Sequence, residues 1–307
     1  MKPQKSLHLS IPLPERYRKN DFLAFHSRDA QQISEVTTSR GITKGILWSG
    51  CPAQLTIVFR KNEADVRLST DGILEADSEK LLLRIGRRML GLEQAVEVFE
   101  AEYAEHPLLG SLVKAGAGLR VPQTATPFEA LSWAIIGQQV SVSAAVSIRR
   151  RFILAAGVRH SKGLWCFPDA HAVAALNPEI LRGAGFSRSK AESLFGLSND
   201  IVSGRLPIDN WLDLLSQGAL DVSELQKRLL AVKGIGPWTV SYMLLRGFGW
   251  LDGSLHGDVA VRRNLAKLLG REDGIPEKEA EQWLAEFSPW RALVAAHLWA
   301  MQSRSGY

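Results

Sequence analysis

Cysteine is scarce in this sequence, since only Cys51 and Cys166 occur among its 307 residues. Two cysteines so far apart predict no disulfide framework. They also exclude an iron–sulfur cluster held by four cysteines of one chain. Long apolar runs are missing too, and none reaches the roughly 20 residues that a membrane-spanning helix needs. Residues 1–20 lack the apolar core of a signal peptide. We therefore expect a cytoplasmic protein without a membrane partner.

Charge is only mildly unbalanced, with 37 Lys and Arg against 32 Asp and Glu, a net charge of +5. The excess lies within residues 111–270, which hold 18 basic and 11 acidic residues. A basic surface favours DNA, because neutralising its phosphates releases counterions. Proteins that bind no DNA often carry such a surface as well, so charge alone does not decide.

Residues 1–95 show the alternation of apolar and polar residues that is typical of strands. Residues 76–92 have helical spacing instead, with Leu82, Ile85, Met89 and Leu92 on one stripe. The predicted fold of this part is an α+β domain, a small antiparallel sheet with helices on it. The expected strands cover residues 7–13, 41–48, 54–61 and 64–70.

From residue 96 onward the pattern is helical, so the fold class is mostly α. Thr126 and Pro127 followed by Glu129 predict a helix start, and Asn177 and Pro178 predict another. Further capping boxes are expected at Ser189 with Glu192 and at Ser223 with Gln226. We expect one helical domain over 119–249 and a second built from 96–118 plus 250–307. The end of the chain, 303–307, is expected to be frayed.

A glycine hairpin stands out in this helical part, Gly234-Ile235-Gly236. Glycines allow a tight turn and leave no side chain between the backbone and a ligand. Backbone N–H groups of the turn and of the next helix can then donate to a phosphate. Carbonyls on the other side, those of Leu230, Val232 and Ile235, can hold a monovalent cation, Na⁺ or K⁺. The alternative is a helix end followed by a new helix at Pro237.

Asp258 lies about two dozen residues after the hairpin, at the start of another predicted helix. A helix N-terminus favours an ionised acid. An ordinary N-cap aspartate is the alternative, and the two roles are compatible. A phosphate grip followed by a carboxylate points to an enzyme that acts on a nucleotide inside DNA.

Three segments carry a resemblance to a known family: residues 229–263, with the hairpin and Asp258, residues 134–142 and residues 289–299. Together they resemble the helix–hairpin–helix, Gly-Pro-Asp (HhH-GPD) superfamily of DNA glycosylases, and within it the AlkA-type 3-methyladenine DNA glycosylases. The first domain is similar to that family's TATA-binding-protein-like N-terminal domain. The resemblance implies excision of alkylated purines from double-stranded DNA by a monomer, without a required cofactor.

The resemblance also implies roles for single residues. Asp258 matches the essential aspartate, which stabilises the positive charge that builds on the deoxyribose. Trp238, Tyr242 and Trp299 match residues that line the pocket for a flipped base, and electron-rich rings attract a cationic alkylated base. Trp238 also stands where bifunctional members carry a catalytic lysine, which implies a glycosylase that uses water.

The sequence departs from the AlkA-type pattern at the wedge that fills the gap left by a flipped base. Gln138 is followed by Gln139 where the pattern has a leucine, so an amide replaces an apolar wedge. Because of this departure, one alternative is a glycosylase whose substrate is a different damaged purine, deaminated or oxidised. A catalytically silent DNA-binding module is the other alternative. We also expect His256 at the surface, and phosphate contacts from Arg149, Arg150, Arg151, Arg188 and Lys190.

Overall fold

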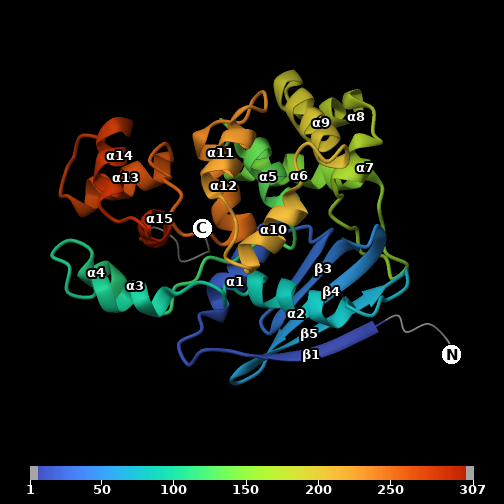
Figure 1. The fold of residues 1–307 in the computed structure, drawn as a ribbon, viewed down its shortest axis with the longest axis horizontal. Coiled ribbons are helices and arrows are strands. Elements are labelled where there is room, and N and C mark those ends of the chain that lie inside the picture. The colour runs from blue at the N-terminus through green and yellow to red at the C-terminus, as the bar shows by residue number, and fades with distance from the viewer. Residues whose placement is uncertain (1–5, 302–307) are drawn as a thin grey trace.

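The computed structural model describes residues 6–301, so the expectation for residues 303–307 lies outside it. Its N-terminal part is a five-stranded antiparallel sheet in the order β1-β5-β4-β3-β2, which confirms the predicted sheet (Figure 1). The strand β2 was not expected, because its four residues are too few to show an alternating pattern. The strands are β1 (Ser6–Pro12), β2 (Glu35–Thr38), β3 (Gly41–Trp48), β4 (Cys51–Phe59) and β5 (Glu63–Thr70).

Two helices, α1 (Lys19–His26) and α2 (Ser78–Met89), contribute to the core of this sheet. Leu82 and Met89 of α2 are buried against it, as the stripe in the sequence predicts. Phe22 and Leu23 of α1 join the same core. The sequence did not indicate α1, since a helix of eight residues gives little periodicity to read.

The rest of the described chain is helical. Its elements are α3 (Val96–Tyr103), α4 (Gly110–Ala115), α5 (Pro127–Gly137), α6 (Val142–Ala156), α7 (Ala170–Ala174), α8 (Pro178–Gly183), α9 (Arg188–Val202), α10 (Ile208–Ser216), α11 (Val222–Leu230), α12 (Pro237–Met243), the π-helical η1 (Leu244–Phe248), α13 (Val259–Leu268), α14 (Glu277–Ala285) and α15 (Arg291–Ala300). The mostly α fold class is therefore confirmed. No helix of the described part is long and apolar enough to cross a membrane.

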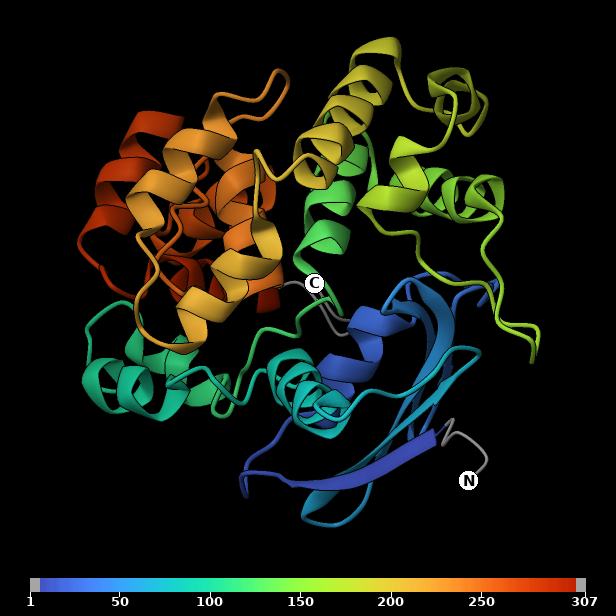
Figure 2. The ribbon, with the colours of Figure 1, turned by 45° about the vertical axis from the view of Figure 1, so that its right-hand side comes forward.

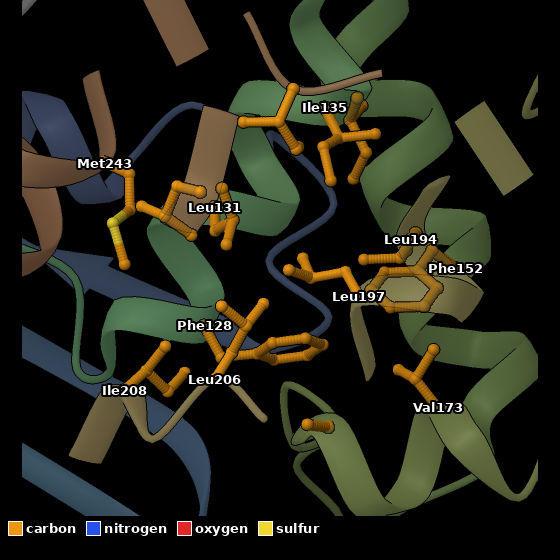
Figure 3. Packing of buried hydrophobic residues seen from close by; sticks show 14 of the residues in the cluster. Phe128, Leu131, Ile135, Phe152, Val173, Leu194, Leu197, Leu206, Ile208 and Met243 are labelled. Atoms are coloured by element: carbon orange, nitrogen blue, oxygen red, sulfur yellow. The ribbon is translucent and has the colours of Figure 1, made fainter. Parts of the chain in front are cut away.

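The helices form two further apolar cores. One joins α5–α12 and η1, and Figure 3 shows side chains from α5, α6 and α9 meeting in it, among them Leu131, Phe152 and Leu194. The other joins α3 and α4 to α13, α14 and α15. Figures 1 and 2 show these segments, far apart in the sequence, side by side. Tyr242 and Leu245 contribute to the second core, so α12 and η1 run between the two.

Of the four helix starts predicted before the hairpin, two lie where the sequence places them. The Thr126 side chain accepts from the Glu129 N–H, and Asn177 accepts from Glu179, both as predicted. The capping boxes at Ser189 and Ser223 are wrong. The true caps lie two residues earlier, where Ser187 caps α9 and Asp221 caps α11. In both cases an earlier Ser or Asp was already able to satisfy the free N–H groups of the first turn.

A buried ionic cluster ties the sheet domain to the helices. The Lys44 ammonium contacts Glu35 of β2 and lies 2.7 Å from the Glu129 carboxylate of α5. The Arg149 guanidinium of α6 lies 3.0 Å from each of these two carboxylates. The predicted phosphate contact of Arg149 is therefore wrong, because its charge is buried and paired. Arg150 likewise pairs with Asp29 at 2.5 Å, and Arg151 donates to the Ala184 carbonyl.

Candidate functional site

The hairpin between α11 and α12 has the geometry that its glycines predict. Gly234 has a φ of +85°, and a Cβ there would stand 2.1 Å from the Ser193 Oγ. Gly236 is the N-cap of α12, with open space where a Cβ would lie. Ile235 between them is buried and anchors the turn in the core. Gly234 is exposed, so a DNA phosphate can approach the backbone N–H groups of the turn.

The carbonyls of Leu230, Val232 and Ile235 remain the predicted cation ligands. The Val232 carbonyl accepts the Ile235 N–H at 3.1 Å across the turn, and a carbonyl oxygen has a second lone pair for another partner. Neutral oxygen ligands of this kind suit a hard cation such as Na⁺ or K⁺. The cation stays a prediction.

Asp258 is the N-cap of α13, and four N–H groups converge on its carboxylate. Its Oδ1 accepts from the backbone N–H of Ala260 at 2.9 Å and of Val261 at 3.0 Å. The indole N–H of Trp299 reaches the same oxygen at 3.1 Å, and that of Trp238 reaches Oδ2 at 3.1 Å. Because an ionised carboxylate only accepts hydrogen bonds, this set of donors matches its charged form.

The three aromatic residues singled out in the sequence line one cavity with Asp258. Trp238 and Tyr242 lie on one face of α12 with ring centroids 5.3 Å apart. Trp299 comes from α15, at the other end of the chain's helical part. The cavity measures about 760 Å³ and opens between α5, α6, α12 and α13, which is large enough to take a purine base.

The predicted wedge loop forms the rim of this cavity. Gln139 is exposed and has a φ of +54°, a left-handed conformation at the tip of the loop between α5 and α6. Gln138 instead points back into the protein, where its amide nitrogen lies 3.0 Å from both the Gly234 carbonyl and the Thr239 hydroxyl. The wedge loop and the hairpin are thus joined directly. The Lys190 ammonium also supports this loop, since it donates to the Ile136 and Gln138 carbonyls at 2.9 and 2.6 Å.

Three charged or aromatic residues of the cavity were not indicated by the sequence: Arg28, Trp133 and Arg246. Arg28 follows α1 in the sheet domain, 206 positions before Gly234 in the sequence. Arg246 lies in η1 and is buried, with its Cζ 4.6 Å from the Phe25 ring and 5.8 Å from the Trp299 ring. Trp133 sits on the predicted helix α5, but nothing in the sequence separates its aromatic ring from a core residue.

His256, expected at the surface, is half-buried beside the site. Its Nδ1 lies 2.8 Å from the Ser254 hydroxyl, and its Nε2 lies 3.7 Å from the Glu277 carboxylate. The first contact lies within the loop before Asp258, and the second joins this loop to α14. His256 therefore holds this loop in place and does not line the cavity.

Comparisons with known proteins point to one family. The family model for the HhH-GPD superfamily of base excision DNA repair proteins matches residues 132–289, just over half of the chain. The DNA-3-methyladenine glycosylase of Bacillus subtilis is 25% identical over 298 residues, which cover 92% of this chain and 96% of that protein. DNA-3-methyladenine glycosylase 2 of Escherichia coli is 32% identical over 193 residues, which cover 62% of this chain and 63% of that protein.

Two solved structures share the fold over nearly the whole length. The 3-methyladenine DNA-glycosylase of Archaeoglobus fulgidus superposes with a TM-score of 0.78 at 20% identity, over 95% of this chain and 97% of that chain. The 8-oxoguanine glycosylase/lyase of Clostridium acetobutylicum, bound to double-stranded DNA, gives a TM-score of 0.70 at 16% identity, over 98% of both chains. At sequence identities this low, the similarity to these two structures supports a shared fold and no more.

Proposed function

Because this chain belongs to the HhH-GPD superfamily of base excision DNA repair proteins, we propose that it is a DNA glycosylase of the 3-methyladenine type. In this role it flips an alkylated purine out of double-stranded DNA, hydrolyses its N-glycosidic bond and leaves an abasic site. The observation that carries the proposal is the carboxylate of Asp258, held by four N–H donors at the wall of an aromatic cavity. A DNA-binding module without catalysis has no use for a negative charge in that place.

The proposed reaction follows from the geometry around Asp258. The bond between the sugar C1′ and the purine nitrogen breaks, its electron pair leaves with the base, and positive charge builds on the sugar. The Asp258 Oδ2 accepts a single hydrogen bond from the described residues, that of Trp238. Its remaining lone pair can face this charge. Water then adds to C1′, and its proton is released as the abasic sugar forms.

Water, and not an amine of the protein, is proposed as the nucleophile. Trp238 stands where a lysine would be needed, and no lysine is among the described residues that line the cavity. Lys233, which precedes the hairpin, is exposed and lies 3.3 Å from the Glu192 carboxylate. We therefore expect no covalent intermediate between enzyme and DNA, and no strand cleavage.

The hairpin and the wedge loop are proposed as the DNA contacts. The backbone N–H groups of Gly234 and Gly236 would hold a phosphate without reading the sequence, while the Ile235 N–H closes the turn on the Val232 carbonyl. Gln139 would enter the gap that the flipped base leaves, since its exposed amide can hydrogen-bond the orphaned partner base. A monomer satisfies this arrangement, because one chain supplies all of these groups.

The test of the proposed function is release of methylated purines from alkylated DNA by the wild type and by Asp258→Asn. Asparagine keeps the N-cap of α13 but lacks the negative charge. We expect the variant to lose at least about a hundredfold in single-turnover rate and to keep its affinity for DNA. Full activity of the variant would refute the role of Asp258, and binding without release by the wild type would favour the silent module. Trapping of a covalent complex with borohydride would refute hydrolysis by water.

A further inference from the structure

The inner wall of the cavity carries a positive charge from the sheet domain, the guanidinium of Arg28. Arg28 and Trp133 line the 760 Å³ cavity and also a second, small cavity of about 30 Å³ between the sheet domain and α5. These two side chains therefore form the partition between the open cavity and the protein interior.

Arg28 belongs to a stacked series of rings and guanidinium groups that begins beside Asp258 and ends at Trp133. The Trp299 indole donates to Asp258, and the Arg246 Cζ lies 5.8 Å from the Trp299 ring. The Phe25 ring follows, with the Cζ atoms of Arg246 and Arg28 each 4.6 Å from its centroid. Trp133 ends the series, 5.6 Å from the Arg28 Cζ. Because Asp258 and Arg28 line the same cavity, a base with its sugar at Asp258 can extend toward Arg28.

The donors of Arg28 are available to a ligand. Within residues 6–301 the Arg28 guanidinium stacks on Phe25 and Trp133 but makes no hydrogen bond or ion pair. The nearest carboxylate in the sequence, Asp29, is already paired with Arg150. A guanidinium offers five N–H donors and no acceptor. Its planar fork suits an oxygen acceptor on a base edge.

We propose that Arg28 reads the edge of the flipped purine opposite the sugar and selects purines with an oxygen at position 6. A purine carries the sugar on N9, and its N1 and position-6 group lie at the opposite edge. A 6-oxo group accepts from the guanidinium, as in 7-methylguanine or hypoxanthine. A 6-amino group, as in 3-methyladenine, presents N–H donors and no acceptor to the N–H donors of the guanidinium, so no hydrogen bond forms. The inference rests on the proposed glycosylase function and narrows its substrate class.

The test compares two bases released from one sample of methylated DNA, 7-methylguanine and 3-methyladenine. Both are cationic in DNA, so net charge does not distinguish them, and the effect of a variant on each base is measured against the wild-type rate for the same base. The variant Arg28→Met keeps most of the unbranched apolar stem but removes the guanidinium, and with it every donor and the stacking of the Cζ on Phe25 and Trp133. Arg40→Met is the matched control, because Arg40 is an exposed arginine of the same domain outside the cavity.

We expect Arg28→Met to slow release of 7-methylguanine about tenfold or more, and to change release of 3-methyladenine less than about twofold. Arg40→Met should change neither rate. An equal loss for both bases, or no loss for either, would overturn the selection by Arg28. If the wild type released neither base, the proposed glycosylase function would fail instead. A check that needs no variant is inhibition of the wild type by free bases, where hypoxanthine should inhibit more strongly than adenine. Equal inhibition would count against the inference.

Discussion

At the scale of single residues, the placement of Asp258 is the most informative feature. Its four hydrogen-bond donors come from α12, α13 and α15. Helix packing therefore fixes the carboxylate before any DNA binds, so little reorganisation is needed when charge builds on the sugar. The two tryptophans have a double role in this account. Their rings are proposed to face the base, while their N–H groups donate to the acid.

The indole N–H of Trp238 should matter apart from its ring. Trp238→Phe keeps an aromatic face beside Tyr242 but removes the hydrogen bond to Asp258 Oδ2. Hydrogen bonds to a charged group contribute about 1.5–3 kcal/mol, so we expect the single-turnover rate to fall roughly ten- to a hundredfold. The control is Trp283→Phe, which changes a tryptophan of α14 that packs on Phe287 outside the cavity. A full rate for Trp238→Phe would show that the hydrogen bond is dispensable.

How far the sequence predicts this site depends on how local its parts are. One short motif contains Gly234, Trp238 and Tyr242, and Asp258 begins the next helix. The resemblance therefore predicts that these residues lie close together. Trp299 could be assigned to the pocket only by matching residues 289–299 to the family's pattern. Arg28 was not predictable, because it reaches the cavity only through packing of the sheet domain against the helices. Burial of Arg149 was missed for the same reason, since its partners Glu35 and Glu129 lie on two other elements.

At the scale of elements, the hairpin offers a pair of substitutions that separate folding from DNA binding. Gly236→Ala adds a Cβ where the free protein has open space. We expect it to leave stability within about 0.5 kcal/mol but to weaken DNA binding about tenfold or more, because the methyl group stands between backbone and phosphate. Equilibrium binding to an undamaged duplex and urea unfolding measure the two effects.

Gly234→Ala is the matched comparison and should act on the fold. Its φ of +85° and the Ser193 side chain both oppose a Cβ. A loss of about 1–3 kcal/mol in unfolding free energy is expected. If Gly236→Ala destabilised the protein as much as Gly234→Ala, or bound DNA normally, the open space at Gly236 would not be the phosphate approach.

The wedge loop depends on α9 through one lysine. Lys190→Met removes the hydrogen bonds from its ammonium to the Ile136 and Gln138 carbonyls. We expect slower base release, by about tenfold, because the tip at Gln139 is then less well placed. Affinity for undamaged DNA should change less. Lys227→Met, at an exposed site on α11, should have no effect. An unchanged rate for Lys190→Met would show that the loop keeps its position without this support.

At the scale of the whole molecule, three apolar cores and one ionic cluster hold the elements that surround the cavity in one frame. The cluster joins β2 and β3 to α5 and α6 through Lys44 and Arg149. Burial alone would raise the pKa of Glu35, but the charges of Lys44 and Arg149 hold that pKa well below its usual range. The N-terminal domain thereby orients α5, and with it Trp133, and supplies Arg28 to the cavity.

Acid should destabilise this frame through two buried histidines. Burial lowers the pKa of His26, and burial together with the charge of Arg18 lowers the pKa of His297 to about 4. The unfolded chain takes up these protons near pH 6.5. Stability is therefore full above that pH and is lost as the pH falls toward 4. For a histidine shifted as far as His297, the loss between pH 7 and pH 5 is about 2 kcal/mol.

Urea unfolding at the two pH values measures this loss, and His297→Gln should reduce the difference between them. Equal or greater wild-type stability at pH 5 would contradict the assignment of neutral histidines to the folded state.

Asp258 is proposed to stabilise positive charge on the deoxyribose. The most direct test of this claim is the affinity of the protein for duplexes with an abasic-site analogue, either a neutral tetrahydrofuran or a cationic pyrrolidine. We predict that the wild type binds the pyrrolidine duplex at least about tenfold more tightly, as a transition-state mimic requires. Asp258→Asn should bind both duplexes alike. Equal wild-type affinities, or a preference that survives in Asp258→Asn, would contradict the claim.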